Sequence, residues 1–213
     1  VLPDTTEQVS KVLKYCSEQG IKVVPRGSGT SLSGGALPLA DGVLLGLSKF
    51  KRIREIDFDN RAVVTEPGVT NLAISKAVED EAFYYAPDPS SQIACSIGGN
   101  VAENSGGVHC LKYGMTTNNL LGCEIVLMSG EILRIGGKAA ENSGYDLMGI
   151  ITGSEGLLGV ITEITVRILQ KPETARALMV GFAEVEAAGE CVARIIGAGI
   201  IPGGMEMMDK PAI

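Results

Sequence analysis

Two glycine-rich segments hold the groups with which this sequence could bind an anionic ligand. The first, Pro25–Gly35, follows the apolar run Ile21–Val24, and the second is Ser96–Gly107. Glycine lets successive backbone N–H groups turn toward one point, and such turns form anion-binding concavities. Two such segments in one chain favour a ligand with a phosphate part and a second, extended part, and a dinucleotide fits that description.

The first segment differs from the familiar phosphate-binding motifs. A Walker A loop needs a lysine after its last glycine, but Gly34 is followed by Gly35 and Ala36. The dinucleotide fingerprint needs a third glycine where this sequence has Leu32. What remains is a loop whose N–H and hydroxyl groups could donate to a diphosphate, and hydrogen bonds to charged oxygens are strong. A plain turn between two strands is the alternative, although a turn needs fewer glycines.

The histidine and the cysteines suggest little chemistry of their own. His109 is the sole histidine, and a structural role is favoured, although its position after the second glycine-rich segment makes it a weak catalytic candidate. The five cysteines are odd in number and form no C-x-x-C pair. This pattern predicts reduced thiols in a cytoplasmic protein and no metal site.

Composition narrows the class of protein. The net charge is −7 and the lysines and arginines do not cluster, so a nucleic-acid partner is not expected. No apolar stretch approaches the roughly 18 residues of a membrane span, so we expect no transmembrane segment. The sequence starts at Val1 without methionine and stops at Ile213 within an apparent element, which predicts a piece of a longer protein.

The elements that must position these loops can be read from the hydrophobic pattern. A helix capped by Asp4 or Thr5 should run to Gly20, because Val9, Leu13 and Cys16 have helical spacing. Strands 21–25 and 43–47 should flank the first glycine-rich segment. Further predicted elements are a hairpin of 53–58 with 62–66, a helix at 71–80, a hairpin of 124–128 with 131–135, a helix at 145–152 and a strand at 160–169.

Two regions depart from this regular pattern. Residues 81–119 form a predicted irregular stretch that includes the second glycine-rich segment, and a long loop inside a compact domain is usually functional. After Lys171 the pattern predicts a strand at 177–182 and a helix at 185–198. This unit is too short to close its own sheet, so we interpret it as the beginning of a second domain.

Several spaced motifs together resemble one known family. These are Pro25–Gly35, Pro87–Ser91, Ser96–Gly107, Lys112–Gly114 and Gly153–Glu163, in that order. They resemble the motifs of the vanillyl-alcohol-oxidase-like flavoproteins with a PCMH-type FAD-binding domain, and are most similar to the FAD-linked subunits of glycolate oxidases. The resemblance covers essentially the whole sequence. It implies an α+β fold, with a PCMH-type FAD-binding domain of two α/β subdomains at 1–171 and the truncated start of a ferredoxin-like cap domain at 172–213.

The resemblance also implies the residues that bind FAD. In the family, backbone N–H groups of the first loop hold the diphosphate, and the later motifs line the ribityl chain, the flavin ring and the adenine. Some relatives attach FAD to a histidine at the position of Thr30, so non-covalent FAD is expected here. Tyr113 has the alternative of a packed core residue. Carried over, the cofactor-binding residues are Arg26, Gly27, Ser28, Gly29, Thr30, Ser31, Ser33, Gly34, Pro87, Asp88, Ser96, Gly98, Gly99, Asn100, Ala102, Asn104, Ser105, Gly106, Gly107, Tyr113, Gly114, Gly153, Val160 and Ile161.

The implied activity is oxidation of a small 2-hydroxy acid, with hydride transfer from the substrate Cα to flavin N5. Glycolate is the favoured substrate. A D-lactate or D-2-hydroxyglutarate dehydrogenase, more remotely a sugar-nucleotide enolpyruvyl reductase, and a non-catalytic flavin-binding accessory subunit stay open. In the family, the base, the carboxylate-binding groups and a metal site belong to the cap domain, so the catalytic residues are expected beyond this sequence. Other glycolate oxidase subunits are the expected partners, and they could also bring the protein to a membrane.

Overall fold

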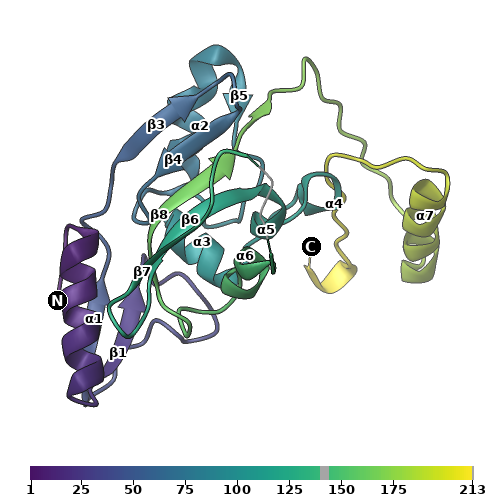
Figure 1. Ribbon diagram of the computed structural model, residues 1–213. Coiled ribbons are helices and arrows are strands. Elements are labelled where there is room, and N and C mark those ends of the chain that lie inside the picture. The colour runs from purple at the N-terminus through teal and green to yellow at the C-terminus, as the bar shows by residue number, and fades with distance from the viewer. Residues whose placement is uncertain (140–143, 213) are drawn as a thin grey trace.

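The computed structural model describes residues 1–139 and 144–212, and it begins with a small helix–strand unit (Figure 1). Helix α1 (Thr6–Glu18) starts where the Thr5 hydroxyl accepts a hydrogen bond from the Gln8 N–H, as a helix cap should. Strands β1 (Lys22–Arg26) and β2 (Gly42–Gly46) pair in parallel, and the first glycine-rich segment connects them. The predicted helix and both predicted strands are confirmed.

A five-stranded antiparallel sheet forms the larger part of the fold. Its order is β3 (Ile53–Asp57), β4 (Ala62–Thr65), β8 (Val160–Arg167), β6 (Leu120–Val126) and β7 (Ile132–Gly136). Both predicted hairpins are therefore present, and the predicted strand at 160–169 occupies the centre of the sheet. Helices α2 (Asn71–Val78) and α3 (Ile97–Glu103) contribute Ile74, Ile97 and Val101 to the core that this sheet covers.

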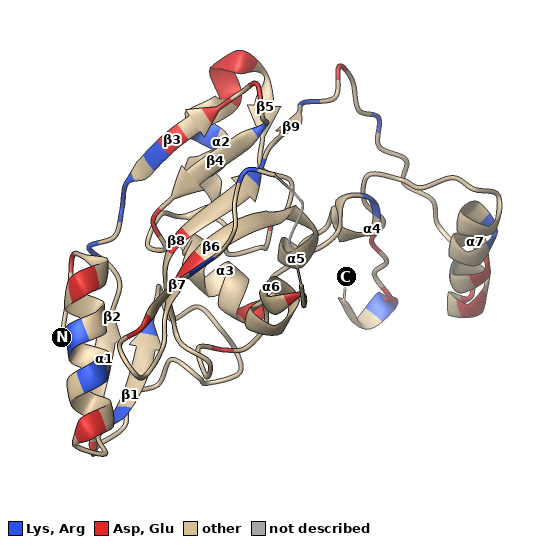
Figure 2. Cartoon of the chain, in the orientation of Figure 1, with Lys and Arg blue, Asp and Glu red and all other residues tan. Residues whose placement is uncertain are grey.

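A second, smaller core joins the two parts of the fold. Val9 and Leu13 of α1 pack with Leu45, Phe50 and residues of the sheet. The result is two α/β subdomains in an α+β fold, which confirms the predicted fold class. Charged residues of both signs lie along α1 and β3 (Figure 2), as expected for solvated faces.

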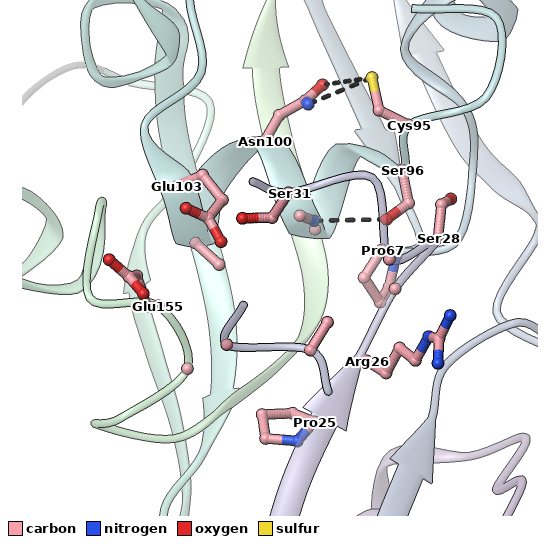
Figure 3. A pocket seen from close by; sticks show the side chains of 18 of the residues that line it. Pro25, Arg26, Ser28, Ser31, Pro67, Cys95, Ser96, Asn100, Glu103 and Glu155 are labelled. Carbon is pink, nitrogen blue, oxygen red and sulfur yellow. Dashed lines mark hydrogen bonds between the residues drawn. The ribbon is translucent and has the colours of Figure 1, made fainter. Parts of the chain in front are cut away.

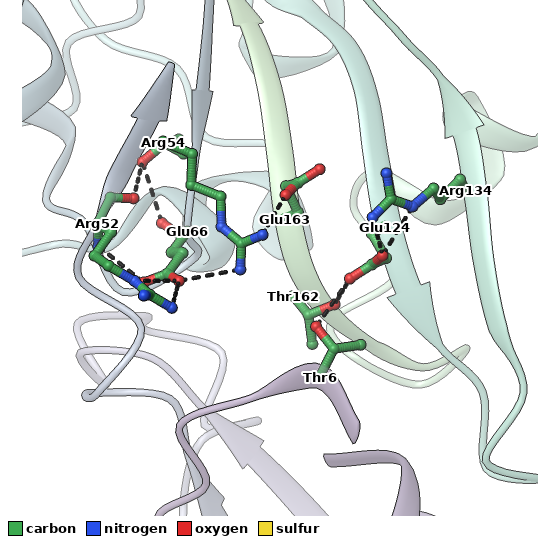
Figure 4. Close-up of polar contacts among 9 residues, drawn as sticks. Thr6, Arg52, Arg54, Glu66, Glu124, Arg134, Thr162 and Glu163 are labelled. Carbon is green, nitrogen blue, oxygen red and sulfur yellow. Dashed lines mark hydrogen bonds and ion pairs between the residues drawn. The ribbon is translucent and has the colours of Figure 1, made fainter. Parts of the chain in front are cut away.

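Two buried carboxylates form the centres of polar contacts in the fold (Figure 4). The Glu124 carboxylate on β6 accepts hydrogen bonds of 2.9 Å from the hydroxyls of Thr6 and Thr162, and Arg134 pairs with it at 2.9 Å. This contact attaches the start of α1 to the sheet. The Glu66 carboxylate, only 1% exposed, pairs with Arg52 at 2.8 Å and Arg54 at 3.1 Å.

The predicted irregular stretch at 81–119 is wrong in detail. It contains η1 (Glu79–Glu81) at its edge, β5 (Phe83–Tyr84), α3, α4 (Cys110–Tyr113) and α5 (Thr116–Asn119). Most of the second glycine-rich segment is thus the helix α3, although glycine is a poor helix former. Ser96 supplies the reason, because it caps this helix and the buried side chains Ile97 and Val101 hold it against the core.

The region after the sheet is less regular than predicted. A short strand β9 (Leu169–Gln170) pairs with β5, and the chain then runs to α7 (Val185–Gly197) and η2 (Lys210–Ala212). The predicted strand at 177–182 is wrong: residues 175–183 form no strand, and Leu178 and Met179 are 93% and 100% exposed. A strand needs a neighbour for its N–H and C=O groups. The predicted helix at 145–152 is confirmed as the shorter α6 (Leu147–Ile151).

Candidate functional site: a cofactor pocket between the glycine-rich segments

A cavity of about 280 Å³ opens between the first glycine-rich segment, helix α3 and the loop before β8 (Figure 3). Segments that are far apart in the sequence therefore meet at one place, as the sequence predicted for a dinucleotide. The lining residues are Pro25, Arg26, Gly27, Ser28, Gly29, Thr30, Ser31, Leu32, Gly35, Ala36, Leu47, Pro67, Ser91, Cys95, Ser96, Gly98, Gly99, Asn100, Ala102, Glu103, Ser105, Ser154, Glu155, Gly156, Gly159, Val160 and Ile161.

The first loop offers unpaired backbone donors to this cavity. Strand β1 ends at Arg26, whose carbonyl accepts a hydrogen bond from the Leu47 N–H at 3.0 Å. Beyond it, the N–H groups of residues 28–32 donate to no protein acceptor within 1–139 and 144–212. Gly29 has a φ of 70°, a left-handed value that glycine adopts without strain. A run of free N–H groups in a loop that lines a cavity is suited to the oxygens of a diphosphate.

The glycines of the second segment have a different role from the one predicted. The N–H groups of Ile97 and Gly98 donate to the carbonyls of Val69 and Pro67, and the Gly99 N–H donates to the Ser96 hydroxyl at 3.4 Å. These groups are therefore already engaged. The expectation that this segment provides a second turn of free N–H groups is corrected for Gly98 and Gly99.

Close approach of the backbone explains these glycines. A Cβ atom on Gly98 would lie 2.5 Å from the Cβ of Pro67, and a Cβ on Gly27 would lie 2.2 Å from the Ser96 hydroxyl oxygen. Real side chains do not tolerate such distances, so α3 could not pack this closely on Pro67 if Gly98 carried a side chain, nor on the first loop if Gly27 did. The glycines set the width of the cavity.

The third wall of the cavity, the loop before β8, is attached to α3 through backbone hydrogen bonds. The N–H groups of Gly153 and Glu155 donate to the carbonyls of Val101 and Ala102 at 2.9 and 2.8 Å. Glu155 has a φ of 53°, which is unusual for a residue with a side chain. A Cβ on Gly156 would lie 2.7 Å from Pro25, so this wall also contacts the end of β1.

Most of the predicted cofactor residues line the cavity. Those that do are Arg26, Gly27, Ser28, Gly29, Thr30, Ser31, Ser96, Gly98, Gly99, Asn100, Ala102, Ser105, Val160 and Ile161. Those that lie outside the lining are Ser33, Gly34, Pro87, Asp88, Asn104, Gly106, Gly107, Tyr113, Gly114 and Gly153. FAD is larger than this cavity, and contacts of both groups with it stay a prediction.

Some of the predicted cofactor residues outside the lining, here called the outer group, are directly connected to it. The buried amide of Asn71 donates to the carbonyl of Pro87 at 2.9 Å and to the side-chain oxygen of Asn100 at 3.0 Å. Asn100 lines the cavity, so Pro87 is held one side chain away from it. Asp88 follows, and Gly107 lies against it, because a Cβ on Gly107 would be 2.3 Å from the Asp88 carbonyl oxygen.

His109 lies beside this outer group and does not line the cavity. Its Nδ1 is 2.7 Å from the Asp88 carboxylate. The Tyr113 ring is 6.4 Å from the His109 ring and 6.1 Å from the Tyr84 ring, between centroids. Burial and a hydrogen bond with Tyr113 raise the pKa of Tyr84 above its ordinary value of 10. Tyr113 therefore belongs to an aromatic cluster, but it is half-buried and in neither of the two hydrophobic cores described, so its cofactor role and its alternative as a packed core residue both stay predictions.

Sequence reasoning missed several lining residues. Pro67 follows β4 and packs on Gly98, while Glu103 and Glu155 place carboxylates toward the cavity (Figure 3). Glu155 was quoted within its motif but given no role, and its left-handed backbone leaves no clear mark in the sequence. Arg26 is the one cation among the lining residues. Favourable contacts with a diphosphate must therefore come mainly from backbone donors.

The remaining chemistry of the described residues is limited. They contain no group of three or more His, Cys, Asp or Glu residues placed to hold a metal ion. Cys16, Cys95, Cys110, Cys123 and Cys191 form no disulfide. No helix in the described part of the chain is long and apolar enough to cross a membrane.

The observed pocket has features that suit part of the FAD that the sequence resemblance implies. Free N–H groups of the first loop suit a diphosphate, and the missing Cβ atoms let the walls of the pocket pack closely on one another.

Curated relatives match over the full length of this sequence. It is 57% identical over 213 residues to glycolate oxidase subunit GlcD of Escherichia coli, covering 100% of this chain and 43% of the relative. Identity to glycolate oxidase subunit GlcD of Bacillus subtilis is 44%, covering 100% and 46%. Identity to D-lactate dehydrogenase of Archaeoglobus fulgidus is 38%, covering 100% and 48%. The chain thus spans less than half the length of these relatives.

A solved structure and two family models also match this chain. A structure of alkyldihydroxyacetonephosphate synthase matches with a TM-score of 0.81 and 21% identity, covering 96% of this chain and 37% of that one, which shows a shared fold. The family model described as "FAD linked oxidases, C-terminal domain" matches residues 171–213. The family model described as "FAD binding domain" matches residues 1–136. The chain therefore belongs to this family of FAD-binding domains from FAD-linked oxidoreductases, and its cofactor is FAD.

Proposed function

We propose that the protein is an FAD-dependent oxidoreductase of small 2-hydroxy acids, with glycolate as the first candidate substrate. The observation that carries this proposal is the 57% identity to a glycolate oxidase subunit over 213 residues. That match includes every segment that builds the pocket. D-lactate is the second candidate, because a D-lactate dehydrogenase is 38% identical over the whole chain. D-2-hydroxyglutarate shares the same carboxylate and hydroxyl, so it belongs in the same test.

In this proposal the first loop holds the FAD diphosphate. The free N–H groups of residues 28–32 donate to phosphate oxygens. The hydroxyls of Ser28, Thr30 and Ser31 belong to the same loop and can donate further hydrogen bonds to the diphosphate. Hydrogen bonds to charged oxygens are about twice as strong as neutral ones. The adenosine lies toward Val160 and Ile161, and the flavin lies toward Cys95, Asn100 and the Pro87–Asp88 segment.

The bound flavin supplies the acceptor for the hydride that leaves the substrate Cα. The residues of this chain bind and orient it, and the close packing of α3 on the first loop excludes water from the cavity floor. The two carboxylates of the lining, Glu103 and Glu155, lie beside the first loop, where this proposal places the diphosphate, so we assign the base for the substrate hydroxyl elsewhere. We place that base, and the groups for the substrate carboxylate, in the C-terminal domain, with a domain boundary near residue 171.

Partners and compartment follow the same reasoning. Two relatives are named as subunits of glycolate oxidase, so we propose that this protein works with other subunits of such an enzyme. The unpaired cysteines favour the cytoplasm, and partner subunits offer a route to a membrane surface. Copurification of a tagged full-length protein with other glycolate oxidase subunits, from the soluble and from the membrane fraction, would test the proposed partners and the proposed route to a membrane surface.

The decisive experiment has two parts. Purified full-length protein should carry flavin absorbance, and glycolate should bleach it and reduce a dye acceptor more efficiently than D-lactate or D-2-hydroxyglutarate do. The order of kcat/KM values identifies the substrate. Bound flavin that none of these acids reduces would leave an accessory, non-catalytic flavin subunit as the function, and protein without flavin would overturn the proposal.

A further inference from the structure

The pair formed by Asp88 and His109 fixes the loop between α3 and α4. Asp88 uses both carboxylate oxygens on one residue: Oδ2 lies 2.7 Å from the His109 Nδ1, and Oδ1 accepts from the His109 backbone N–H at 3.3 Å. Two contacts to one side chain hold both the ring and the backbone of His109. A carboxylate that orients an imidazole in this manner also fixes which edge of the ring faces outward.

The same pair is coupled to the wall of the FAD pocket. Gly107 packs directly on the backbone of Asp88, and the Cys110 sulfur accepts a hydrogen bond from the Gly107 N–H at 2.8 Å. On the other side, Pro87 is tied through Asn71 to Asn100, which lines the cavity. A displacement of the Asp88–His109 pair would therefore also shift the residues of the pocket wall, because packed contacts and hydrogen bonds connect the two.

The C-terminal segment touches the outward side of this loop. After α7 the chain returns toward α4 (Figure 1). A Cβ on Gly203 would lie 3.9 Å from the His109 Cδ2, and a Cβ on Gly204 would lie 2.7 Å from the Val108 Cγ1. The residues of Pro202–Met205 are half-buried, while their neighbours on both sides are exposed. Glycine at 203 and 204 permits this approach.

We propose that Val108 and His109, held by Asp88, form a seat for the segment Pro202–Met205, and that seating of this segment and FAD binding strengthen each other. The inference rests on the proposed FAD site. It gives the lone histidine a role as a positioning residue between the region that matches the FAD-binding family and the region that matches the C-terminal domain family. Because coupling between two binding events is reciprocal, either one can be measured.

The first test compares FAD affinity in three proteins. Gly204→Val should push the segment off the seat, because the new side chain would overlap Val108. Gly189→Ala on α7 is the matched control, since nothing lies within 4 Å of the added carbon. In titrations of the full-length protein by flavin fluorescence, we expect Gly204→Val to weaken FAD binding about fivefold or more. The Gly189→Ala protein should bind as the wild type does.

The second test observes the seat directly, without depending on activity. In the full-length protein, selective histidine labelling gives imidazole signals by NMR, and the His109 signal is the one that disappears in His109→Gln. Gly204→Val and Asp88→Asn should both shift that signal, and Gly189→Ala should not. Hydrogen exchange of amides 203–205 should slow when FAD is added to the wild type and stay unchanged in Gly204→Val.

The outcomes separate the two proposals. If the wild type binds FAD and Gly204→Val binds it equally well, with an unmoved imidazole signal, the seat is overturned and the proposed function stands. If the wild type binds no FAD, both are overturned. A Gly204→Val protein that loses its overall fold is recognised by its NMR spectrum, and Asp88→Asn then carries the test through the exchange of amides 203–205, which should be faster.

Discussion

At the scale of single residues, missing side chains shape the pocket more than charged ones do. Gly27, Gly98 and Gly156 each lie where two walls meet, and a Cβ on any of them would come within 2.7 Å of Ser96, Pro67 or Pro25. Overpacking of this kind forces the backbone to move or a neighbouring side chain to leave its favoured rotamer. Substitutions at these positions should therefore affect stability and FAD binding together.

Gly27→Ala tests this idea most simply. Its new methyl group would lie 2.2 Å from the Ser96 oxygen, so we expect a loss of about 1–3 kcal/mol in the free energy of unfolding. FAD affinity should fall as well, because the first loop moves away from α3. Gly137→Ala is the control, with nothing within 4 Å of the added carbon. Urea unfolding and flavin titration measure both effects, and equal stability of the two variants would contradict the expectation.

The buried carboxylate of Glu66 makes stability depend on pH. Burial alone would raise the pKa of Glu66, but hydrogen bonds from Arg52 and Arg54 outweigh it and hold the pKa below the ordinary 4.5. A carboxyl with a lowered pKa in the folded state stabilises the fold above the unfolded pKa, and this contribution is lost as pH falls below that value.

Glu66→Gln should therefore cost about 1–3 kcal/mol at pH 7 and progressively less below pH 4.5. Chemical denaturation at a series of pH values measures the difference between variant and wild type. Asp41→Asn serves as control, because the Asp41–Lys22 pair is exposed and should contribute little. A difference for Glu66→Gln that stays constant between pH 7 and pH 3.5 would show that ionisation of this carboxyl is not involved.

At the scale of elements, α3 is a short helix whose position depends on its cap. Ser96 accepts a hydrogen bond from the Gly99 N–H, and its hydroxyl is also the atom nearest to Gly27 on the opposite wall. The start of the helix and the width of the cavity are thus set by the same oxygen. The sequence showed a glycine-rich loop here because glycine weakens the helical signal.

A double-mutant cycle isolates this contact. Ser96→Ala alone should cost about 1 kcal/mol through loss of the cap. In the Gly27→Ala background the same change removes the clashing oxygen, so Ser96→Ala should cost less there or even stabilise the protein. We expect an interaction energy of at least about 0.5 kcal/mol from urea unfolding of the four proteins. Simple additivity would mean that the two walls do not press on each other.

At the scale of the whole molecule, the two subdomains share a pocket built mainly from backbone. Val126 and Val160 of the large sheet belong to the core that also holds α1 and β2, so the subdomains are packed together. The sequence resemblance places Thr30 where some relatives are expected to carry a histidine that binds FAD covalently, and His109 does not line the cavity. We therefore expect a cofactor held by non-covalent contacts alone.

Acid precipitation of the flavin-loaded full-length protein should therefore release all flavin into the supernatant. A fluorescent protein band on a denaturing gel would contradict this. Cys95 is the cavity-lining residue with a nucleophilic side chain, so Cys95→Ser is the informative variant if such a band appears. Loss of the band in that variant would assign the link to the thiol.

Regular elements and the identity of the cofactor were largely predictable. The helical spacing of Val9 and Leu13 and the alternation along 160–167 report local geometry, and they appear as α1 and β8. Where a helix or strand depends on contacts with residues far away in the sequence, prediction failed in two ways: it gave a strand that is absent and missed a helix that is present. Residues 177–182 have strand-like residues but no neighbouring strand, and 97–103 are helical because the core and Ser96 hold them.

The sequence by itself predicted a dinucleotide ligand and most of the regular elements, because donors, glycines and hydrophobic spacing are properties of short segments. The two-subdomain α+β fold and FAD as cofactor followed from the resemblance of its spaced motifs to a known family. Only the tertiary structure decided which glycines offer N–H groups and which allow close packing, and it alone brought Glu155, Pro67 and Asn100 to one cavity. It also placed Gly204 on Val108. Contacts between residues far apart in the chain depend on how elements pack, and no local pattern encodes that distance.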